Sequence, residues 1–132
     1  MQQIINFLNK NDIGQIATVK EGKPVIRPIQ FQFEIQGKFY FLTTNNKDFY
    51  DQLKEMNEVS YVAQNPDSHW VRINGEVVFD NDRDLIEKIF ENRPYIKELF
   101  KTTDNPVLEL FYVHNGTARL TAMEDVISDV QI

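Results

Sequence analysis

The sequence predicts an α+β fold, in which a six- to seven-stranded antiparallel β-barrel carries short helices between its strands. Short segments that alternate apolar and polar residues recur along the chain, and segments with a helical period separate some of them. This mixture is typical of an antiparallel barrel of the α+β class. Because the chain has no internal repeat and no long linker, we expect residues 1–132 to form one domain.

The first elements are expected to be a short helix and a meander of three strands. The apolar residues of the opening segment share one helical face: Ile4, Ile5, Phe7 and Leu8. Residues 14–44 then alternate apolar and polar residues, with interruptions at Glu21-Gly22 and Gln36-Gly37. Interruptions of this kind are typical of consecutive hairpins.

The middle of the chain is expected to form a helix and two strands. Residues 47–56 return to a helical period, and residues 58–64 form a fourth strand. Residues 69–79 form a long fifth strand, in which Gly75 indicates a bulge or a close backbone approach.

The last third is expected to contain a second amphipathic helix, one further helical turn and a hairpin. Residues 82–92 form the helix and residues 95–100 the additional turn. Residues 107–113 and 117–123 are strand-like and flank His114-Asn115-Gly116, where Asn-Gly is the strongest hairpin signal in the chain.

The composition excludes several classes of function. A net charge of −6 opposes attraction to a phosphate backbone, so we expect no nucleic-acid partner. No apolar run approaches the roughly 20 residues of a membrane span and no secretory signal is visible, so we expect no membrane partner and a cytoplasmic location. Because the chain has no cysteine, disulfides and thiolate catalysis are excluded, and redox chemistry would need a bound cofactor.

Two cations and two hydroxyl groups are expected to lie close together and to form a phosphate pocket. Pairing of the second and third strands through the turn at 36–37 would place Arg27 opposite Thr43 and Thr44. Lys47 would begin the next helix, where free N–H groups and the helix dipole favour an anion. The alternative is that the cations are solvated and that the polar residues merely cap the helix.

The only tryptophan, Trp70, begins the fifth strand beside His69. A tryptophan at such a position is commonly part of the core, but an indole can also form a flat wall against a planar ligand. His69 and His114 are the only histidines and have no metal-ligand spacing, so we expect no metal site. A calcium-loop pattern of acidic residues at 80–91 lacks its glycine and is better explained as an acidic helix start.

These segments together resemble the pyridoxamine 5′-phosphate oxidase-like family, the FMN-binding split barrels. The resemblance rests on "GQIATV", "GKPVIRPIQF", "GKFYFLTTNNKDFYDQL", "EVSYVAQ" and "HWVRINGEVVFDND", and it covers roughly residues 10–120 in the family's order. It implies an α+β split barrel with FMN as cofactor, a small-molecule substrate, and a homodimer with flavin sites at the subunit interface.

The resemblance also implies which residues bind the cofactor. Those implied to hold the flavin phosphate are Arg27, Pro28, Thr43, Thr44 and Lys47. The backbone of Ile29 and Gln30 would run along the flavin ring, and His69 and Trp70 would approach the cofactor.

Neither the residues nor the resemblance assigns a substrate or a catalytic residue. The chain ends at "EDVISDVQI" and lacks the basic C-terminal segment with which the founding enzyme recognises pyridoxal phosphate, which argues against vitamin B6 oxidation. The leading hypothesis is an FMN-dependent oxidoreductase with flavin reductase or nitroreductase-like activity. The alternatives are a non-catalytic module that binds flavin, haem or another planar cofactor, and a purely structural role in assembly.

Overall fold

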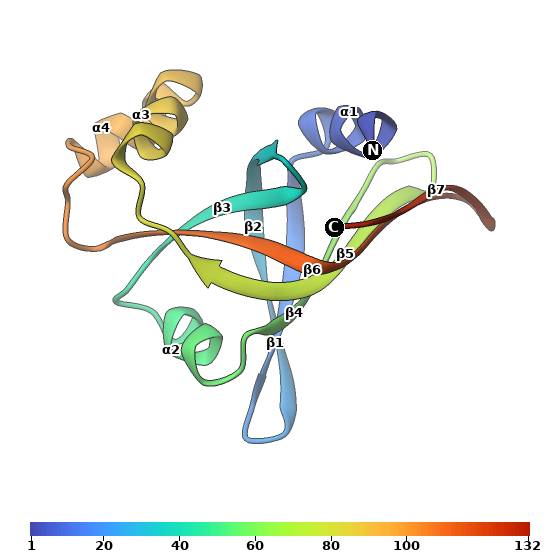
Figure 1. Ribbon diagram of the computed structural model, residues 1–132, viewed down its shortest axis with the longest axis horizontal. Coiled ribbons are helices and arrows are strands. Elements are labelled where there is room, and N and C mark those ends of the chain that lie inside the picture. Colours follow the sequence, from blue (N-terminus) through green and yellow to red (C-terminus); the bar gives the residue numbers. More distant parts are fainter.

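The strands form a closed antiparallel barrel in the computed structural model, which describes residues 1–132 (Figure 1). The strands are β1 (Ile13–Lys20), β2 (Lys23–Ile35), β3 (Lys38–Thr44), β4 (Glu58–Gln64), β5 (His69–Phe79), β6 (Leu108–Ala122) and β7 (Asp125–Gln131). They follow the order β3-β2-β1-β4-β5-β6-β7, and pairing of β3 with β6 closes the first six into a barrel. The predicted fold class, an α+β barrel of six to seven strands, is therefore confirmed.

Four short helices occupy the connections and ends predicted for them. They are α1 (Gln2–Lys10), α2 (Asp48–Glu55), α3 (Arg83–Asn92) and α4 (Pro94–Phe100). Figure 1 shows α1 above one end of the barrel, α2 at its lower left, and α3 and α4 together at one side. None of the four is both long and apolar enough to cross a bilayer.

The three-strand meander is confirmed, and local turn chemistry accounts for it. Both residues of each turn have positive φ: Glu21 at 53° and Gly22 at 76°, and Gln36 at 52° and Gly37 at 78°. This backbone is the two-residue turn whose twist matches the flanking antiparallel strands.

The core consists of two apolar clusters. One fills the barrel interior, and the other lies on the side of the sheet covered by α3 and α4. Phe31, Phe39 and Phe41 belong to the interior cluster, whereas Phe33 and Tyr40 pack with the apolar residues of α3. The register between β2 and β3 shifts between Phe31 and Phe33. Since a bulge changes which face the following side chains occupy, this shift turns Phe33 toward the helices.

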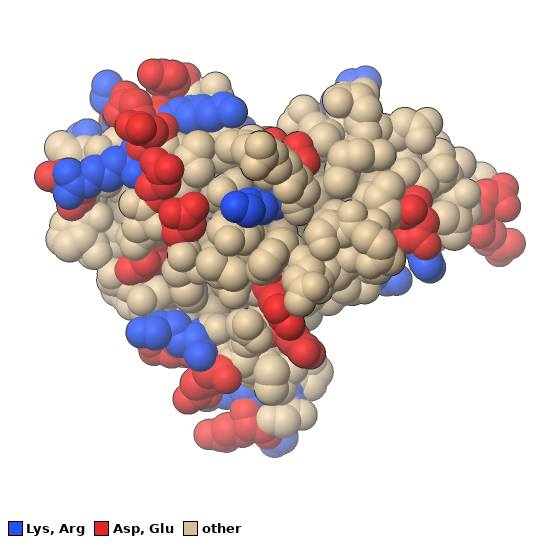
Figure 2. Space-filling view, in the orientation of Figure 1, with Lys and Arg blue, Asp and Glu red and all other residues tan.

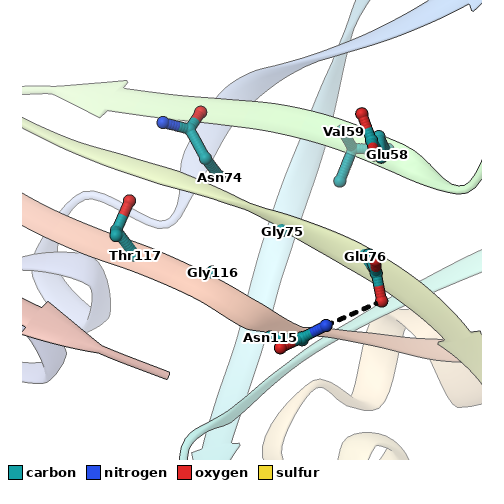
Figure 3. Close-up of a pocket in the computed structure, with 8 residues that line it drawn as sticks. All are labelled: Glu58, Val59, Asn74, Gly75, Glu76, Asn115, Gly116 and Thr117. Atoms are coloured by element: carbon teal, nitrogen blue, oxygen red, sulfur yellow. Dashed lines mark hydrogen bonds between the residues drawn. The ribbon is translucent and has the colours of Figure 1, made fainter.

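The predicted hairpin at His114-Asn115-Gly116 is wrong. β6 runs without a break from Leu108 to Ala122, and the Asn-Gly pair lies inside a bulge opposite Gly75 (Figure 3). Asn115 has the positive φ of 54° that suggested a turn, but β5 continues alongside it. A Cβ on Gly116 would lie 1.9 Å from the carbonyl oxygen of Asn74, so only glycine allows the two strands to approach this closely.

The bulge marks the place where β6 changes its second partner. Residues 108–113 pair with β3 and close the barrel, whereas residues 117–122 pair with β7. The seventh strand is therefore not residues 117–123, as predicted, but Asp125–Gln131, for which no element was predicted. The hairpin that precedes it turns at Met123, where φ is 59°.

Candidate functional site

A groove of about 250 Å³ lies where β3 ends, between the start of α2 and α4. One end is polar and includes Thr43, Thr44 and Lys47. The other end combines apolar side chains of β3 and α4 with two amides from β2. The groove thus brings together segments from 30–32, 42–47 and 95–100, which are far apart in the sequence.

The polar end has the elements of an anion site. Lys47 is exposed and occupies the N-cap position of α2, where no side chain accepts a hydrogen bond from the first-turn N–H groups. Thr43 and Thr44 are buried, and the hydroxyl of Thr44 donates to Asn46 Oδ1 at 2.7 Å. Free N–H groups and the helix dipole favour an anion at such a position. Asp48 and Asp51 in the first turn oppose it, so the hydroxyls and Lys47 must supply part of the attraction.

The opposite end of the groove is formed by the amide of Gln30 and by α4. The hydroxyl of Tyr95 donates to Gln30 Oε1 at 2.5 Å, and Gln30 Nε2 donates to Asp12 at 3.1 Å. Tyr95 and Leu99 are 56% and 71% exposed, although Leu99 is apolar and the ring of Tyr95 is largely so. This end therefore offers an aromatic and aliphatic wall with one fixed polar contact.

Arg93 holds α4 in place beside the groove. Its guanidinium forms an ion pair with Asp12 at 3.0 Å, donates through Nε to Gln32 Oε1 at 2.8 Å, and donates to the carbonyl oxygen of Phe31 at 3.1 Å. Three charge-assisted contacts from one planar group fix the junction of α3 and α4 against β2.

Arg27 does not line the groove, contrary to the expected convergence with Thr43 and Thr44. The pairing of β2 with β3 extends from the turn only as far as Phe31 and Phe41, and Arg27 pairs with Ile16 of β1. In the single chain its side chain therefore lies on the α2 side of the barrel rather than beside the two threonines.

Arg27 instead connects β1, β2 and α2 through a closed hydrogen-bond triangle. It donates to Thr18 Oγ1 at 2.7 Å and to Gln52 Oε1 at 2.6 Å, and Thr18 donates to the same Gln52 oxygen at 2.5 Å. The guanidinium carbon lies 4.5 Å from the centre of the Phe49 ring, within cation–π range. Burial lowers the pKa of Arg27, but a guanidinium stays charged. The arginine thus positions the helix whose first turn borders the groove.

The other predicted site residues lie in different parts of the chain. Pro28 is exposed, Ile29 packs against the interior cluster, and only Gln30 of this segment lines the groove. His69 and Trp70 begin β5 and do not line the groove.

Trp70 is not a core residue. It is half-buried, belongs to neither apolar cluster, and faces Gln64 of β4 and Thr121 of β6 across the sheet. The backbone N–H of its neighbour His69 donates to Asn65 Oδ1 at 3.0 Å. An indole held at the surface at the start of a strand leaves a flat apolar face for another molecule.

Gln32, Arg93 and the α4 residues of the groove were not predicted as site residues from the sequence. Residues 95–100 were correctly expected to be helical, but nothing in that segment indicates against which strand the helix packs. The available signal was Arg93-Pro94, a cation at a helix junction that needs a partner elsewhere in the fold.

Comparison with known proteins agrees with this architecture. A family model described as pyridoxamine 5′-phosphate oxidase like matches residues 1–126. The chain belongs to this family. No curated protein matches the chain.

Several solved structures share the fold of this family member. A NimC/NimA family protein of Clostridium acetobutylicum is 25% identical with a TM-score of 0.84, over 98% of this chain and 89% of that one. General Stress Protein 26 of Bacillus anthracis is 16% identical with a TM-score of 0.80, over 99% and 98% of the two chains. A heme binding protein of Mycobacterium smegmatis is 11% identical with a TM-score of 0.77, over 98% of this chain and 56% of that one.

Proposed function

We propose that this chain is an FMN-binding oxidoreductase that acts on a small molecule as a homodimer. The observation that carries the proposal is the groove, in which an uncapped helix start and Lys47 adjoin an aromatic and aliphatic wall. Flavin reductase or nitroreductase-like activity is the reaction class that we favour.

The polar end of the groove fits the phosphate of FMN. Thr43 and Thr44 offer hydroxyl groups, Lys47 offers a cation, and the first turn of α2 offers backbone N–H groups. These are the donor types that hold phosphate groups in proteins. In this proposal Arg27 acts indirectly, because its contacts with Gln52 and Phe49 fix the helix rather than the ligand.

The other end fits one edge of a planar ring system. Leu42, Leu99 and Phe100 provide apolar contact, and the amide of Gln30 provides hydrogen bonding where a ring nitrogen or carbonyl would need it. FMN supplies the redox chemistry when bound, and the protein supplies orientation and exclusion of water. This division of roles suits a chain that has no cysteine of its own.

The size of the groove supports a site shared between two subunits. Its volume of about 250 Å³ is below the roughly 300–1,000 Å³ of typical ligand pockets, so one chain would enclose only part of a flavin. The exposed side chains of Tyr95 and Leu99 border it and would gain from being covered. A second subunit would complete the site, and His69 and Trp70 at the start of its β5 are our candidates for the covering residues.

The first experiment is purification followed by titration with FMN and by steady-state oxidation of NAD(P)H with FMN, a nitroaromatic compound or a quinone as acceptor. The proposal predicts a yellow protein that sustains turnover. A colourless protein that takes up no FMN would contradict the cofactor assignment. FMN binding without turnover would instead support a non-catalytic binding module.

A haem-binding role receives less support from the groove. Its lining contains no histidine, methionine or cysteine, so only Tyr95 or Lys47 could approach a haem iron from this chain. A haem absorbance band after reconstitution, in the absence of FMN uptake, would reverse this preference.

A further inference from the structure

The part of the groove formed by α4 differs in charge from the part at the start of α2. Tyr95 and Leu99 line it and are about one helical turn apart, so their side chains lie on one face of α4, the helix that Figure 1 shows beside α3. We call these two side chains the α4 wall. Ile96 is buried and packs with the apolar residues of α3, which fixes how α4 lies. Lys47 is the only charged residue of the groove lining, and it belongs to the other end.

The cation that precedes α4, Arg93, is engaged within the chain. It forms an ion pair with Asp12 at 3.0 Å and donates to Gln32 Oε1 at 2.8 Å and to the carbonyl oxygen of Phe31 at 3.1 Å. The two charged side chains are only 20% and 26% exposed. An anionic ligand could bind Arg93 only by leaving the largely buried carboxylate of Asp12 without its partner, which is costly. The α4 end of the groove therefore has no free positive charge.

The hydrogen-bonding groups at this end are uncharged. Gln30 Oε1 accepts from the hydroxyl of Tyr95, and Gln30 Nε2 donates one N–H to Asp12. Gln32 Nε2 donates one N–H to the carbonyl oxygen of Gln30 at 3.4 Å. The second N–H of each amide makes no hydrogen bond within the chain. Such donors can bind a carbonyl or nitro oxygen that carries no full negative charge.

We propose that the α4 wall, with the amides of Gln30 and Gln32, selects an uncharged aromatic electron acceptor, either a quinone or a nitroaromatic compound. This inference rests on the proposed function, since the acceptor would lie between the wall and the flavin ring. Tyr95 and Leu99 favour contact with an aromatic ring, and the amide N–H groups favour oxygen atoms at its edge. A carboxylated, sulfonated or phosphorylated acceptor would have to bury its charge where no cation compensates it.

The reaction that this selection serves balances with one further reactant, a nicotinamide donor that reduces the flavin. A quinone takes a hydride from the reduced flavin and a proton from solvent, which gives the hydroquinone and oxidised flavin. A nitroaromatic compound takes the same hydride and proton and loses one oxygen atom as water, which gives the nitroso compound. Neither reaction requires a charged group on the acceptor.

The test is acceptor binding to the oxidised FMN complex, which cannot reduce the acceptor, so that affinity is measured without turnover. Two pairs of ligands differ chiefly in charge: naphthoquinone against naphthoquinone sulfonate, and p-nitrobenzyl alcohol against p-nitrobenzoate. We expect the uncharged member of each pair to bind about tenfold more tightly and to shift the backbone amide resonances of residues 95–100. The uncharged ligand with the higher affinity identifies the acceptor as a quinone or a nitroaromatic compound.

Three variants, each saturated with FMN, add one unit of positive charge at different places. Leu99→Arg puts a cation in the α4 wall, and Asp12→Asn removes the charge that neutralises Arg93, so each should reduce the preference for the uncharged ligand about fivefold. Glu98→Gln is the matched control, because this residue of α4 is exposed and lies outside the groove lining, and it should keep the parental preference. Circular dichroism checks that each variant is folded. Leu99→Arg leaves the Asp12–Arg93 pair intact, so it tests the inference even if Asp12→Asn does not fold.

The outcomes separate this inference from the proposed function. A flavoprotein that binds both members of each pair equally would overturn the inference alone, as would a preference that is the same in Leu99→Arg as in Glu98→Gln. A protein that takes up no FMN would overturn the proposed function, and the inference with it, before any acceptor is added.

Discussion

At the scale of single residues, Lys47 and Arg27 were both expected to hold the flavin phosphate, but the structure gives them different surroundings. Lys47 is exposed at the start of α2 and borders the groove, whereas Arg27 is half-buried and bonded to Thr18 and Gln52. Lys47 is therefore free to bind a ligand, whereas Arg27 stabilises the fold around the groove.

Replacement of Lys47 should weaken FMN without harming the protein. Loss of one charge-assisted contact of roughly 1.5–3 kcal/mol predicts about tenfold to a hundredfold weaker FMN binding by Lys47→Gln, measured by flavin fluorescence. Riboflavin lacks the phosphate and should bind parent and variant alike. Lys20→Gln, an exposed change on β1, is the control. Unchanged FMN affinity in a folded Lys47→Gln protein would mean that this lysine is only a solvated charge.

Replacement of Arg27 should destabilise the fold, because its side chain bonds to buried groups instead of being a solvated cation. Arg27→Ala removes two hydrogen bonds to the buried groups of Thr18 and Gln52, which predicts a loss of about 1–3 kcal/mol in the free energy of unfolding. Urea denaturation measures this loss. Lys23→Ala on the same strand is exposed and should change stability by less than about 0.5 kcal/mol. Equal stabilities of the two variants would show that the hydrogen-bond triangle contributes nothing.

The buried phenol of Tyr61 should make the fold less stable at alkaline pH. Burial, and secondarily the charge of Asp12, raises the pKa of Tyr61 above its ordinary value of 10. The folded state therefore holds this proton more tightly than the unfolded state, so the contribution is complete below about pH 10 and declines as the pH rises further. Tyr61→Phe should flatten this decline in denaturation curves recorded between pH 9 and about pH 11. A decline of the same slope in both proteins would assign it to other groups.

At the scale of elements, the meander could be predicted because its signals are local. Gln36-Gly37 and Glu21-Gly22 adopt the turn geometry that their composition favours, and the strands on either side alternate as expected. Asn115-Gly116 carries a still stronger local signal, but positive φ also occurs in a bulge. Whether such a pair turns the chain depends on the strand that lies opposite, and that information is not local.

The bulge in β6 yields a test of this explanation. Gly116→Ala places a Cβ against the backbone oxygen of Asn74, which cannot move without breaking the β5–β6 pairing, so we expect a loss of more than about 3 kcal/mol or failure to fold. Asn115→Gly keeps the same bulge and relieves the positive φ of 54°, but loses an exposed hydrogen bond to Glu76, so thermal unfolding should occur close to the parent temperature. A stable Gly116→Ala protein would argue against the close approach of the two strands.

Only the part of the groove formed by residues 43–47 could be predicted from the sequence. Thr43 and Thr44 end β3 and Lys47 precedes α2 by one residue, so their proximity follows from the sequence. Gln32 of β2 lies beside Tyr95 and Leu99 of α4 because a bulge in β2 and the contacts of Arg93 bring the helix against this strand. These are tertiary effects that the periodicity of residues 95–100 does not contain.

At the scale of the whole molecule, charge is unevenly distributed over the face drawn in Figure 2. Acidic and basic side chains gather over α3 and α4 and around the β1–β2 turn, whereas the central part carries fewer charges. Large apolar residues are also exposed elsewhere on the chain, among them Ile13 at 63% and Ile26 at 64%. These side chains are candidates for the surface that the proposed dimer would bury.

The dimer predicts a specific role for Trp70. Sedimentation at micromolar concentration should give twice the mass of the chain, and FMN should quench Trp70 fluorescence because the proposed site includes this residue of a second subunit. Trp70→Phe should keep the mass unchanged and alter the flavin spectrum. A monomer that binds FMN with full affinity would contradict the shared site.

The most direct measurement is a comparison of FMN and riboflavin binding to the unaltered protein by fluorescence titration. If the start of α2 holds a flavin phosphate, one FMN should bind per chain, about tenfold to a hundredfold more tightly than riboflavin. Equal affinity for the two ligands, or no binding of either, would contradict the assignment of this groove as a flavin phosphate site.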